Sequence, residues 1–166
     1  MPDRKTMERA AEDKREGKAP TTQAGEFVRE EMHHIREGKH GAQSTKQAIA
    51  IGLSKARRAG VKLPPPKEGT VSEKTRKSAK RAVAAGAHGQ KPASPRRSRA
   101  ITAALKREGH AAASKSALAR QAKSAAQKRT AGARSAAARK AAKTKGPSLR
   151  SAAARKAART RARSTG

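Results

Sequence analysis

Apolar residues recur at helical spacing in two stretches near the start of the chain. In residues 23–37, one helix face carries the apolar side chains of Ala24, Phe27, Val28, Met32 and Ile35. The opposite face carries the polar side chains of Glu26, Glu30, His33 and Glu37. Thr22 stands where a helix N-cap belongs, and Gly38 stands where the helix should end. The pattern predicts an amphipathic helix over residues 23–37.

The second stretch, residues 44–60, begins with a capping box of Ser44 and Gln47 and ends at Gly60. Its small and apolar residues fall within an arc of about 140° at 100° per residue, and they are Ala48, Ile49, Gly52, Leu53, Ala56 and Ala59. The two helices are expected to pack together as a hairpin that is joined by residues 39–43. Val61 and Leu63 are expected to pack against its open end. A weaker helix is expected over residues 7–16.

The pattern changes after residue 63. Three prolines, residues 64–66, stop any helix and favour an extended linker. Beyond them, glycine and proline divide an alanine-rich basic sequence into short expected helices over residues 70–85, 94–108, 115–131, 133–145 and 149–163. The first should use a capping box of Thr70 and Glu73 and end at Gly86. Short isolated helices are marginal in water, so this arm is expected to be partly disordered until phosphates neutralise it.

The chain is too poor in large apolar side chains to form one compact domain. Its 166 residues include 39 alanines but only 17 larger apolar residues, and Phe27 is the only aromatic one. Such a composition offsets too little chain entropy. No run approaches the roughly 20 apolar residues of a membrane span, no secretory signal is seen in residues 1–25, and the lack of cysteine excludes disulfides and thiol catalysis.

The expected fold class is therefore all-α and partly disordered. A small helical module over residues 1–63 is followed by a Pro-rich linker over residues 64–69. An extended arm of short, basic, Ala-rich helices makes up residues 70–166.

Positive charge is concentrated in the arm. The chain carries a net charge of +30, and residues 74–166 hold 27 Lys and Arg against one acid, Glu108. The sequence of residues 134–145 recurs at residues 150–161 with only Lys-to-Arg changes. The surplus charge matches the phosphates of about 13 base pairs of duplex DNA. Aromatic stacking platforms are absent, so binding is expected through backbone contacts with little sequence specificity.

Two groups of basic residues are predicted to contact phosphates. The main group lies in the arm and comprises Arg96, Arg97, Arg139, Lys140, Lys143, Arg155, Lys156 and Arg159. A secondary group lies on the predicted helix at residues 44–60 and comprises Lys46, Lys55, Arg57 and Arg58. The Ser94-Pro95-Arg96-Arg97 segment resembles the Ser-Pro-basic-basic units of eukaryotic linker-histone tails, which lie in A·T-rich minor grooves. The same residues serve equally well as a helix start.

Two other motifs are assigned no ligand. A basic residue, Glu, Gly and a second cation recur at residues 15–18, 36–39 and 107–110, and helix termination explains this better than a nucleotide loop. His33, His34 and His40 lie near Glu30, Glu31 and Glu37, and Glu30-x-x-His33 has the spacing of di-iron bundles but lacks a second such motif. A solvated helix face with Glu–His pairs is therefore the preferred interpretation. We expect no metal and no cofactor. No catalytic set of side chains can be assembled, so the protein is not expected to be an enzyme.

One segment carries a family resemblance. Residues 38–64, GKHGAQSTKQAIAIGLSKARRAGVKLP, resemble a family of small bacterial proteins of unknown function in which such a helical segment precedes a Lys/Arg/Ala-rich tail. The resemblance covers roughly the first 70 residues, implies a bacterial source and brings no catalytic residues. The arm resembles bacterial histone-like and linker-histone tails in composition.

These observations predict a non-enzymatic, histone-like, nucleoid-associated protein of the bacterial cytoplasm that binds double-stranded DNA without marked sequence specificity. An RNA- or ribosome-associated basic protein is the alternative, because A-form backbones would attract the same arm. A stress protectant and a membrane-active cationic protein are further alternatives, but the helices lack the large apolar residues that enter membranes, so no membrane partner is expected. The N-terminal module would position the arm, bind a protein partner or self-associate.

Overall fold

A computed structural model describes residues 2–88 and 94–164, and its regular elements are all helical. The predicted all-α class is confirmed. The chain divides into two compact units, Met1–Gln121 and Ala122–Gly166. The partial disorder expected of the free arm stays a prediction.

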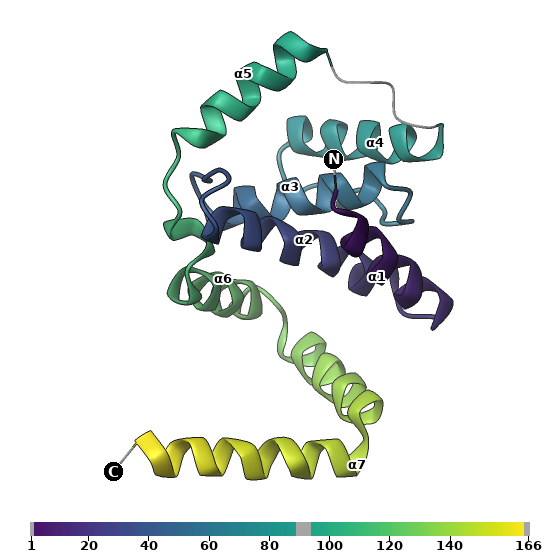
Figure 1. Cartoon of the computed structure of the whole chain (residues 1–166). Coiled ribbons are helices and arrows are strands. Elements are labelled where there is room, and N and C mark those ends of the chain that lie inside the picture. The colour runs from purple at the N-terminus through teal and green to yellow at the C-terminus, as the bar shows by residue number, and fades with distance from the viewer. Residues whose placement is uncertain (1, 89–93, 165–166) are drawn as a thin grey trace. The chain divides into compact units, whose positions relative to one another are not determined.

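The described helices follow one another along the chain in Figure 1. They are α1 (Arg4–Arg15), α2 (Pro20–Arg36), α3 (Thr45–Arg58), α4 (Glu73–Ala87), α5 (Pro95–Lys106), the 3₁₀ turn η1 (Ala111–Ala113), α6 (Lys115–Gln127) and α7 (Ala131–Ser164). Helix α6 spans the division between the two units. Helix α7 is interrupted at Gly146, which has φ 65° and ψ 170°, so the break expected between two basic helices is confirmed.

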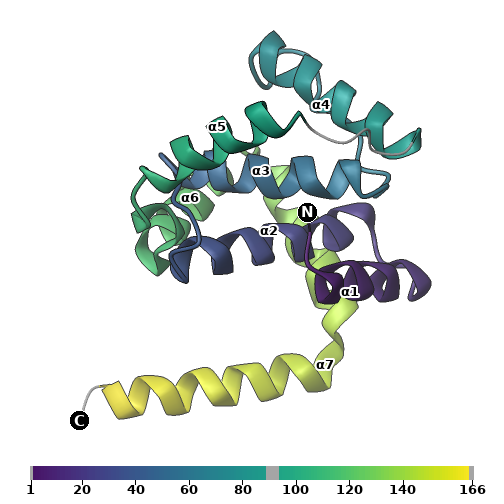
Figure 2. The same ribbon diagram turned by 45° about the horizontal axis from the view of Figure 1, so that its top comes forward.

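The predicted helical hairpin forms the centre of the first unit. Helix α2 packs along α3, and α1 packs on α2, as Figures 1 and 2 both show. The backbones meet at Gly52, where a Cβ atom would lie 2.7 Å from Val28 Cα, so glycine is required for this approach. The predicted closure is also confirmed, because Leu63 is buried and Val61 packs against the same cluster.

Two small apolar clusters stabilise this unit. One contains Ala10, Ala24, Phe27, Ala56 and Leu63, and the other contains Met32, Ile35, Ala42, Ala48, Ala112 and Ala113. The apolar faces predicted for residues 23–37 and 44–60 supply most of these positions. Each alanine buries little apolar surface, so the stability of the unit depends on close backbone packing more than on large side chains.

Helix α3 begins as its sequence predicts, but α2 does not. The Ser44 hydroxyl accepts a hydrogen bond from Gln47 N at 3.2 Å, which confirms this N-cap. Helix α2 begins at Pro20 with Ala19 as N-cap, so the predicted cap Thr22 lies inside its first turn. The fixed φ of proline favours the first helical position and outweighs the side-chain cap.

Helix α4 also starts at a different cap. Ser72, rather than the predicted Thr70, accepts a hydrogen bond from Thr75 N at 3.3 Å. The Thr70 hydroxyl instead donates to Lys67 O at 2.6 Å, in the turn before the helix. Helix α4 then continues through Gly86, its predicted end, to Ala87. It packs against α3 and buries Ala79 and Ala82.

Residues 105–113 return to the connection between α2 and α3, which no sequence pattern predicted. Gly41 N donates to Leu105 O at 2.8 Å, and Ala42 N donates to Gly109 O at 3.1 Å. Thr45 Oγ1 donates to Ala112 O at 2.7 Å, and Arg36 Nε donates to Ala113 O at 2.8 Å. A Cβ atom at Gly41 would lie only 1.9 Å from Glu108 O, so a larger residue there is incompatible with this contact.

The three basic-Glu-Gly-basic patterns do not all serve the same role. Gly17 and Gly38 have φ values of +70° and +74° and end α1 and α2, as predicted. In the first pattern, the cation that follows Gly17 is Lys18, whose Nζ lies 2.8 Å from Asp13 Oδ1. This hydrogen bond raises the pKa of Lys18 above its usual range. Gly109 has no positive φ, and its carbonyl holds the returning segment on Ala42.

Candidate functional site

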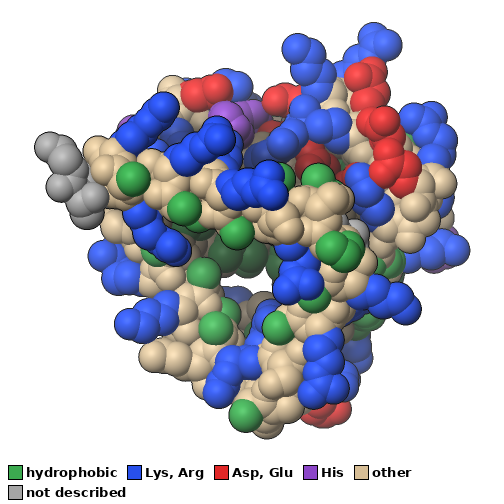
Figure 3. Space-filling view, turned by 90° about the horizontal axis from the view of Figure 1, so that it is seen from below, with side chains coloured by type: hydrophobic (Ala, Val, Ile, Leu, Met, Phe, Trp, Pro, Cys, Tyr) green, Lys and Arg blue, Asp and Glu red, His purple; other side chains and the backbone are tan. Residues whose placement is uncertain are grey.

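The second unit presents basic side chains without carboxylate side chains. Residues 122–166 contain 14 Lys and Arg and no Asp or Glu. Each of these basic side chains that the structure describes is exposed. Figure 3 shows one face of the whole molecule, on which Lys and Arg side chains are widely spread and Asp and Glu side chains appear in fewer places.

The predicted phosphate-contact residues of this unit fall into two equivalent sets on α7. Arg139, Lys140 and Lys143 precede the break at Gly146, and the repeat places Arg155, Lys156 and Arg159 after it. Each set spans about 100° of its helix. Alanine fills most of the opposite side, which also holds Arg134 in the first half of α7 and Arg150 and Arg161 in the second. Each half thus carries a basic stripe with a largely methyl-covered back.

Arg96 and Arg97 lie in the first turn of α5. The helix begins at Pro95, as the helix-start interpretation of this motif predicts, but Ser94 at the N-cap position makes no side-chain cap hydrogen bond. Helix α5 buries none of its residues, and both arginines are exposed.

The four basic residues of α3 divide between the surface and the interior. Lys46 and Arg58 are exposed. Arg57 is buried, donates from Nε to Leu63 O at 3.3 Å and from Nη2 to Pro64 O at 3.2 Å, and burial lowers its pKa. Lys55 pairs with carboxylates of α2. Two of the four predicted contacts are thus engaged inside the protein.

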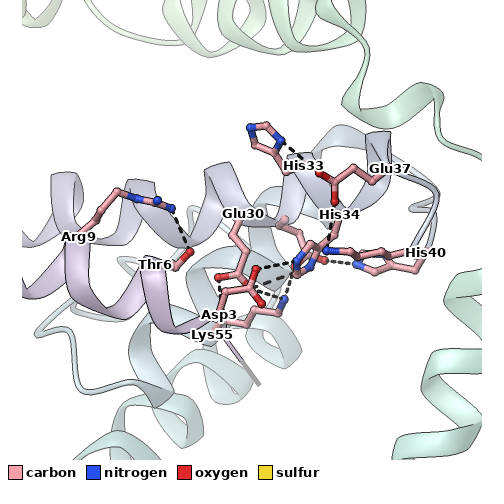
Figure 4. A network of polar contacts seen from close by, with 11 residues as sticks. Asp3, Thr6, Arg9, Glu30, His33, His34, Glu37, His40 and Lys55 are labelled. Atoms are coloured by element: carbon pink, nitrogen blue, oxygen red, sulfur yellow. Dashed lines mark hydrogen bonds and ion pairs between the residues drawn. The ribbon is translucent and has the colours of Figure 1, made fainter.

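A cluster of carboxylates and imidazoles lies between α2, the residues that follow it, and α3 (Figure 4). Glu31 is completely buried, with Oε2 2.7 Å from Lys55 Nζ and Oε1 3.1 Å from His40 Nε2. Glu30 is also buried, with Oε1 3.4 Å from Lys55 Nζ. Asp3 N donates to Glu30 Oε2 at 3.2 Å. The prediction that Glu30 lies on a solvated face is wrong, because α3 and the start of the chain cover it.

The histidines occupy different environments. His33 is exposed and lies 3.9 Å from Glu37, so it stays on the solvated face. His34 Nε2 lies 3.3 Å from Asp3 Oδ2, and its Nδ1 lies 4.0 Å from Glu30 Oε1. The rings of His34 and His40 meet edge to face, with centroids 6.2 Å apart. His34 and His40, rather than His33, therefore belong to the cluster.

Glu31 was grouped with the histidines in the sequence, but its burial was not predicted, although helical spacing contains a signal for it. At 100° per residue, Glu31 lies about 40° from both Phe27 and Ile35, in the middle of the apolar face of α2. A carboxylate at such a position must be paired or neutralised. Its partners come from residues 40 and 55, and sequence spacing along one helix could not identify them.

None of the helices in the described ranges, 2–88 and 94–164, is long and apolar enough to cross a membrane.

Residues 20–67 match a family of unknown function (DUF6496). No curated protein and no solved structure matches the chain. The matched segment contains α2, α3 and their connection, with Glu30, Glu31, His34, His40 and Lys55, and it ends before α4. Over its helical hairpin, the chain is thus similar to a family of unknown function, DUF6496.

Proposed function

We propose that this protein binds double-stranded DNA through contacts with the phosphate backbone, as a non-enzymatic, histone-like component of a bacterial nucleoid. The observation that carries the proposal is the second unit, with 14 Lys and Arg and no Asp or Glu. Each cation that meets a phosphate releases condensed counterions, which supplies affinity without reading the base sequence.

The geometry of α7 suits such contacts. Arg155, Arg159 and Arg163 follow one another at four-residue spacing, so they advance by about 12 Å along one side of the helix. Duplex DNA carries one charge per roughly 1.7 Å, so several phosphates lie within that length. The alanines between the arginines allow the helix to approach closely, and each guanidinium can donate two hydrogen bonds to one phosphate.

The first unit contributes less to binding in this proposal. Its acidic residues offset most of the basic ones up to residue 73, where 15 Lys and Arg face 11 Asp and Glu. On α3, Lys46 and Arg58 alone of the four predicted contacts are exposed. The hairpin then serves mainly to carry the arm.

The test compares two variants of the full chain that lose the same charge. The first replaces basic residues of α7 by glutamine, at Arg139, Lys143, Arg155 and Arg159. The matched control replaces exposed basic residues of the first unit, at Lys5, Lys14, Lys62 and Lys67. Duplex affinity is measured by fluorescence anisotropy at several salt concentrations, and circular dichroism checks the helix content of both variants.

Loss of four phosphate contacts should make the slope of log K against log salt shallower by about 3 to 4 in the α7 variant. The control should keep the slope of the original chain to within about 1. Equal losses of affinity and equal changes of slope in both variants would show that net charge, not the basic stripes of α7, governs binding. Displacement of the chain by duplex RNA at a far lower concentration than by duplex DNA would overturn the DNA assignment in favour of RNA.

A further inference from the structure

The cluster beside α2 brings together three side chains that are suited to hold a metal ion. One ligand atom each from Glu31, His34 and His40 lies within 4.8 Å of the others. Asp3, Glu30 and His34 form an adjoining group that meets the same criterion. These residues come from the start of the chain, from α2 and from the loop after it.

The two oxygens of Glu31 face different partners. Oε1 lies 3.1 Å from His40 Nε2, whereas Oε2 lies 2.7 Å from Lys55 Nζ. Although these are close ion-pair distances, neither oxygen has a partner with hydrogen-bond geometry. One oxygen can thus bind a cation while the other stays beside the ammonium group of Lys55.

The hydrogen bonds of both histidines leave one ring nitrogen directed to the cluster. His40 Nδ1 lies 3.0 Å from Gly41 O, and a carbonyl only accepts, so this nitrogen carries the proton and Nε2 faces Glu31. His34 Nε2 lies 3.3 Å from the Asp3 carboxylate, which leaves its Nδ1 available. Metal-binding histidines usually donate their second N–H to a carbonyl or a carboxylate in this way.

Charge balance favours a divalent cation. Asp3, Glu30 and Glu31 bring three negative charges to the cluster, and Lys55 brings one positive charge. With neutral imidazoles the group carries a net charge of −2 beside the apolar core, which one divalent cation would balance. The distance between Glu31 Oε1 and His40 Nε2, 3.1 Å, is close to the roughly 3.3 Å that separates two tetrahedral zinc ligands.

In contrast to the expectation from the sequence, which included no metal, we propose that Glu31, His34 and His40 form a site for a divalent transition-metal ion of the zinc type. Two imidazoles and one carboxylate favour Zn²⁺ over Mg²⁺ or Ca²⁺, which prefer oxygen ligands throughout. Glu30 or a water molecule completes the coordination. Asp3 orients His34, Gly41 O orients His40, and Lys55 neutralises the second oxygen of Glu31. The ion joins α2 to the loop that follows it and so stabilises the hairpin.

The experiment measures Zn²⁺ binding to the full chain by calorimetry after treatment with a chelator. The test variants are Glu31→Gln and His40→Gln, and the matched control is His33→Gln, which alters an exposed histidine on the same helix. Thermal unfolding with and without Zn²⁺ accompanies each titration. Co²⁺ substitution reports the coordination geometry through its visible absorption.

The proposal predicts one Zn²⁺ per chain, an affinity reduced on the order of a hundredfold by either test variant, and a change of less than twofold in the control. Removal of the partner of His34 in Asp3→Asn should weaken binding by about tenfold, as loss of an orienting group does elsewhere. Zn²⁺ should raise the melting temperature of the original chain and of His33→Gln, but not that of His40→Gln. If Glu31→Gln does not fold, His40→Gln tests the site instead, because His40 is only half-buried.

Several results would overturn the proposal of a metal site. They are the absence of saturable Zn²⁺ binding, an equal loss of affinity in His33→Gln, and undiminished binding in a folded His40→Gln. A Co²⁺ spectrum typical of octahedral coordination by water would also exclude it.

Discussion

Replacement of Gly41 by alanine should release residues 105–113 from the loop between α2 and α3. The new Cβ atom would lie 1.9 Å from Glu108 O and 2.3 Å from Glu108 C, far inside van der Waals contact. Both of these atoms belong to the backbone, so no side-chain rotation relieves the overlap. Gly41 has no positive φ, so alanine is compatible with its backbone conformation and the hairpin itself should still form.

The magnitude follows from the bonds that hold the segment. Two backbone hydrogen bonds, from Gly41 N and Ala42 N, and two side-chain bonds, from Thr45 and Arg36, join it to the hairpin. At about 1 kcal/mol net for each bond, they contribute about 4 kcal/mol. Local opening in the original chain then has an equilibrium constant on the order of 10⁻³.

Hydrogen exchange at the amide of Ala42 measures this directly, because that amide donates to Gly109 O. We expect Gly41→Ala to lose up to about three orders of magnitude of protection there. Trypsin should also cleave faster after Lys106 and Arg107. Gly109→Ala is the matched control, since a Cβ atom at Gly109 meets nothing within 4 Å. Unchanged protection in Gly41→Ala, or an equal loss in Gly109→Ala, would show that close backbone contact at Gly41 does not hold residues 105–113 in place.

Three further changes test the packing of the first unit. Phe27→Ala should lower the free energy of unfolding by about 3 to 4 kcal/mol in denaturant titration, because Phe27 is 1% exposed in the core, and a loss below about 1 kcal/mol would contradict this. Ser44→Ala should cost about 1 kcal/mol as a lost N-cap, whereas Ser94→Ala, whose side chain makes no cap bond, should cost almost nothing. Arg57→Gln should cost about 1 to 3 kcal/mol, because two backbone carbonyls lose their donor. Arg58→Gln, on the surface, should stay within about 0.5 kcal/mol of the original chain, and equal effects of the two arginine changes would contradict the assignment.

Sequence patterns within single helices predicted the positions of the helices well. The 3.6-residue period identified the buried faces of α2 and α3. The face of α2 carries Phe27, Met32 and Ile35, whereas that of α3 is formed by Ala48, Gly52 and Ala56. Glycines 17, 38 and 60 end their helices with positive φ, as the sequence indicates. Helix starts were harder, because Pro20 and Ser72 compete with nearby threonines for the same role.

Contacts between distant segments could not be predicted. Residues 105–113 are held by backbone groups and by Ala112 and Ala113, and alanine is so frequent after residue 73 that it marks no position as buried. Likewise, the ion pairs of half-buried Lys55 and the burial of Arg57 depend on partners from α2 and from the Pro-rich linker. A basic residue on a helix looks the same in sequence whether it faces phosphate or a carboxylate of its own chain.

The proposed function requires that the basic arm binds the phosphate backbone of duplex DNA. The most direct measurement is the affinity of the full chain for two fluorescent duplexes, one A·T-rich and one G·C-rich, across a range of salt concentrations. If about six cations contact phosphates at once, the slope of log K against log salt should be about −5 and nearly equal for both duplexes. A slope shallower than about −1, or no binding at low salt, would contradict binding of the arm to the DNA backbone.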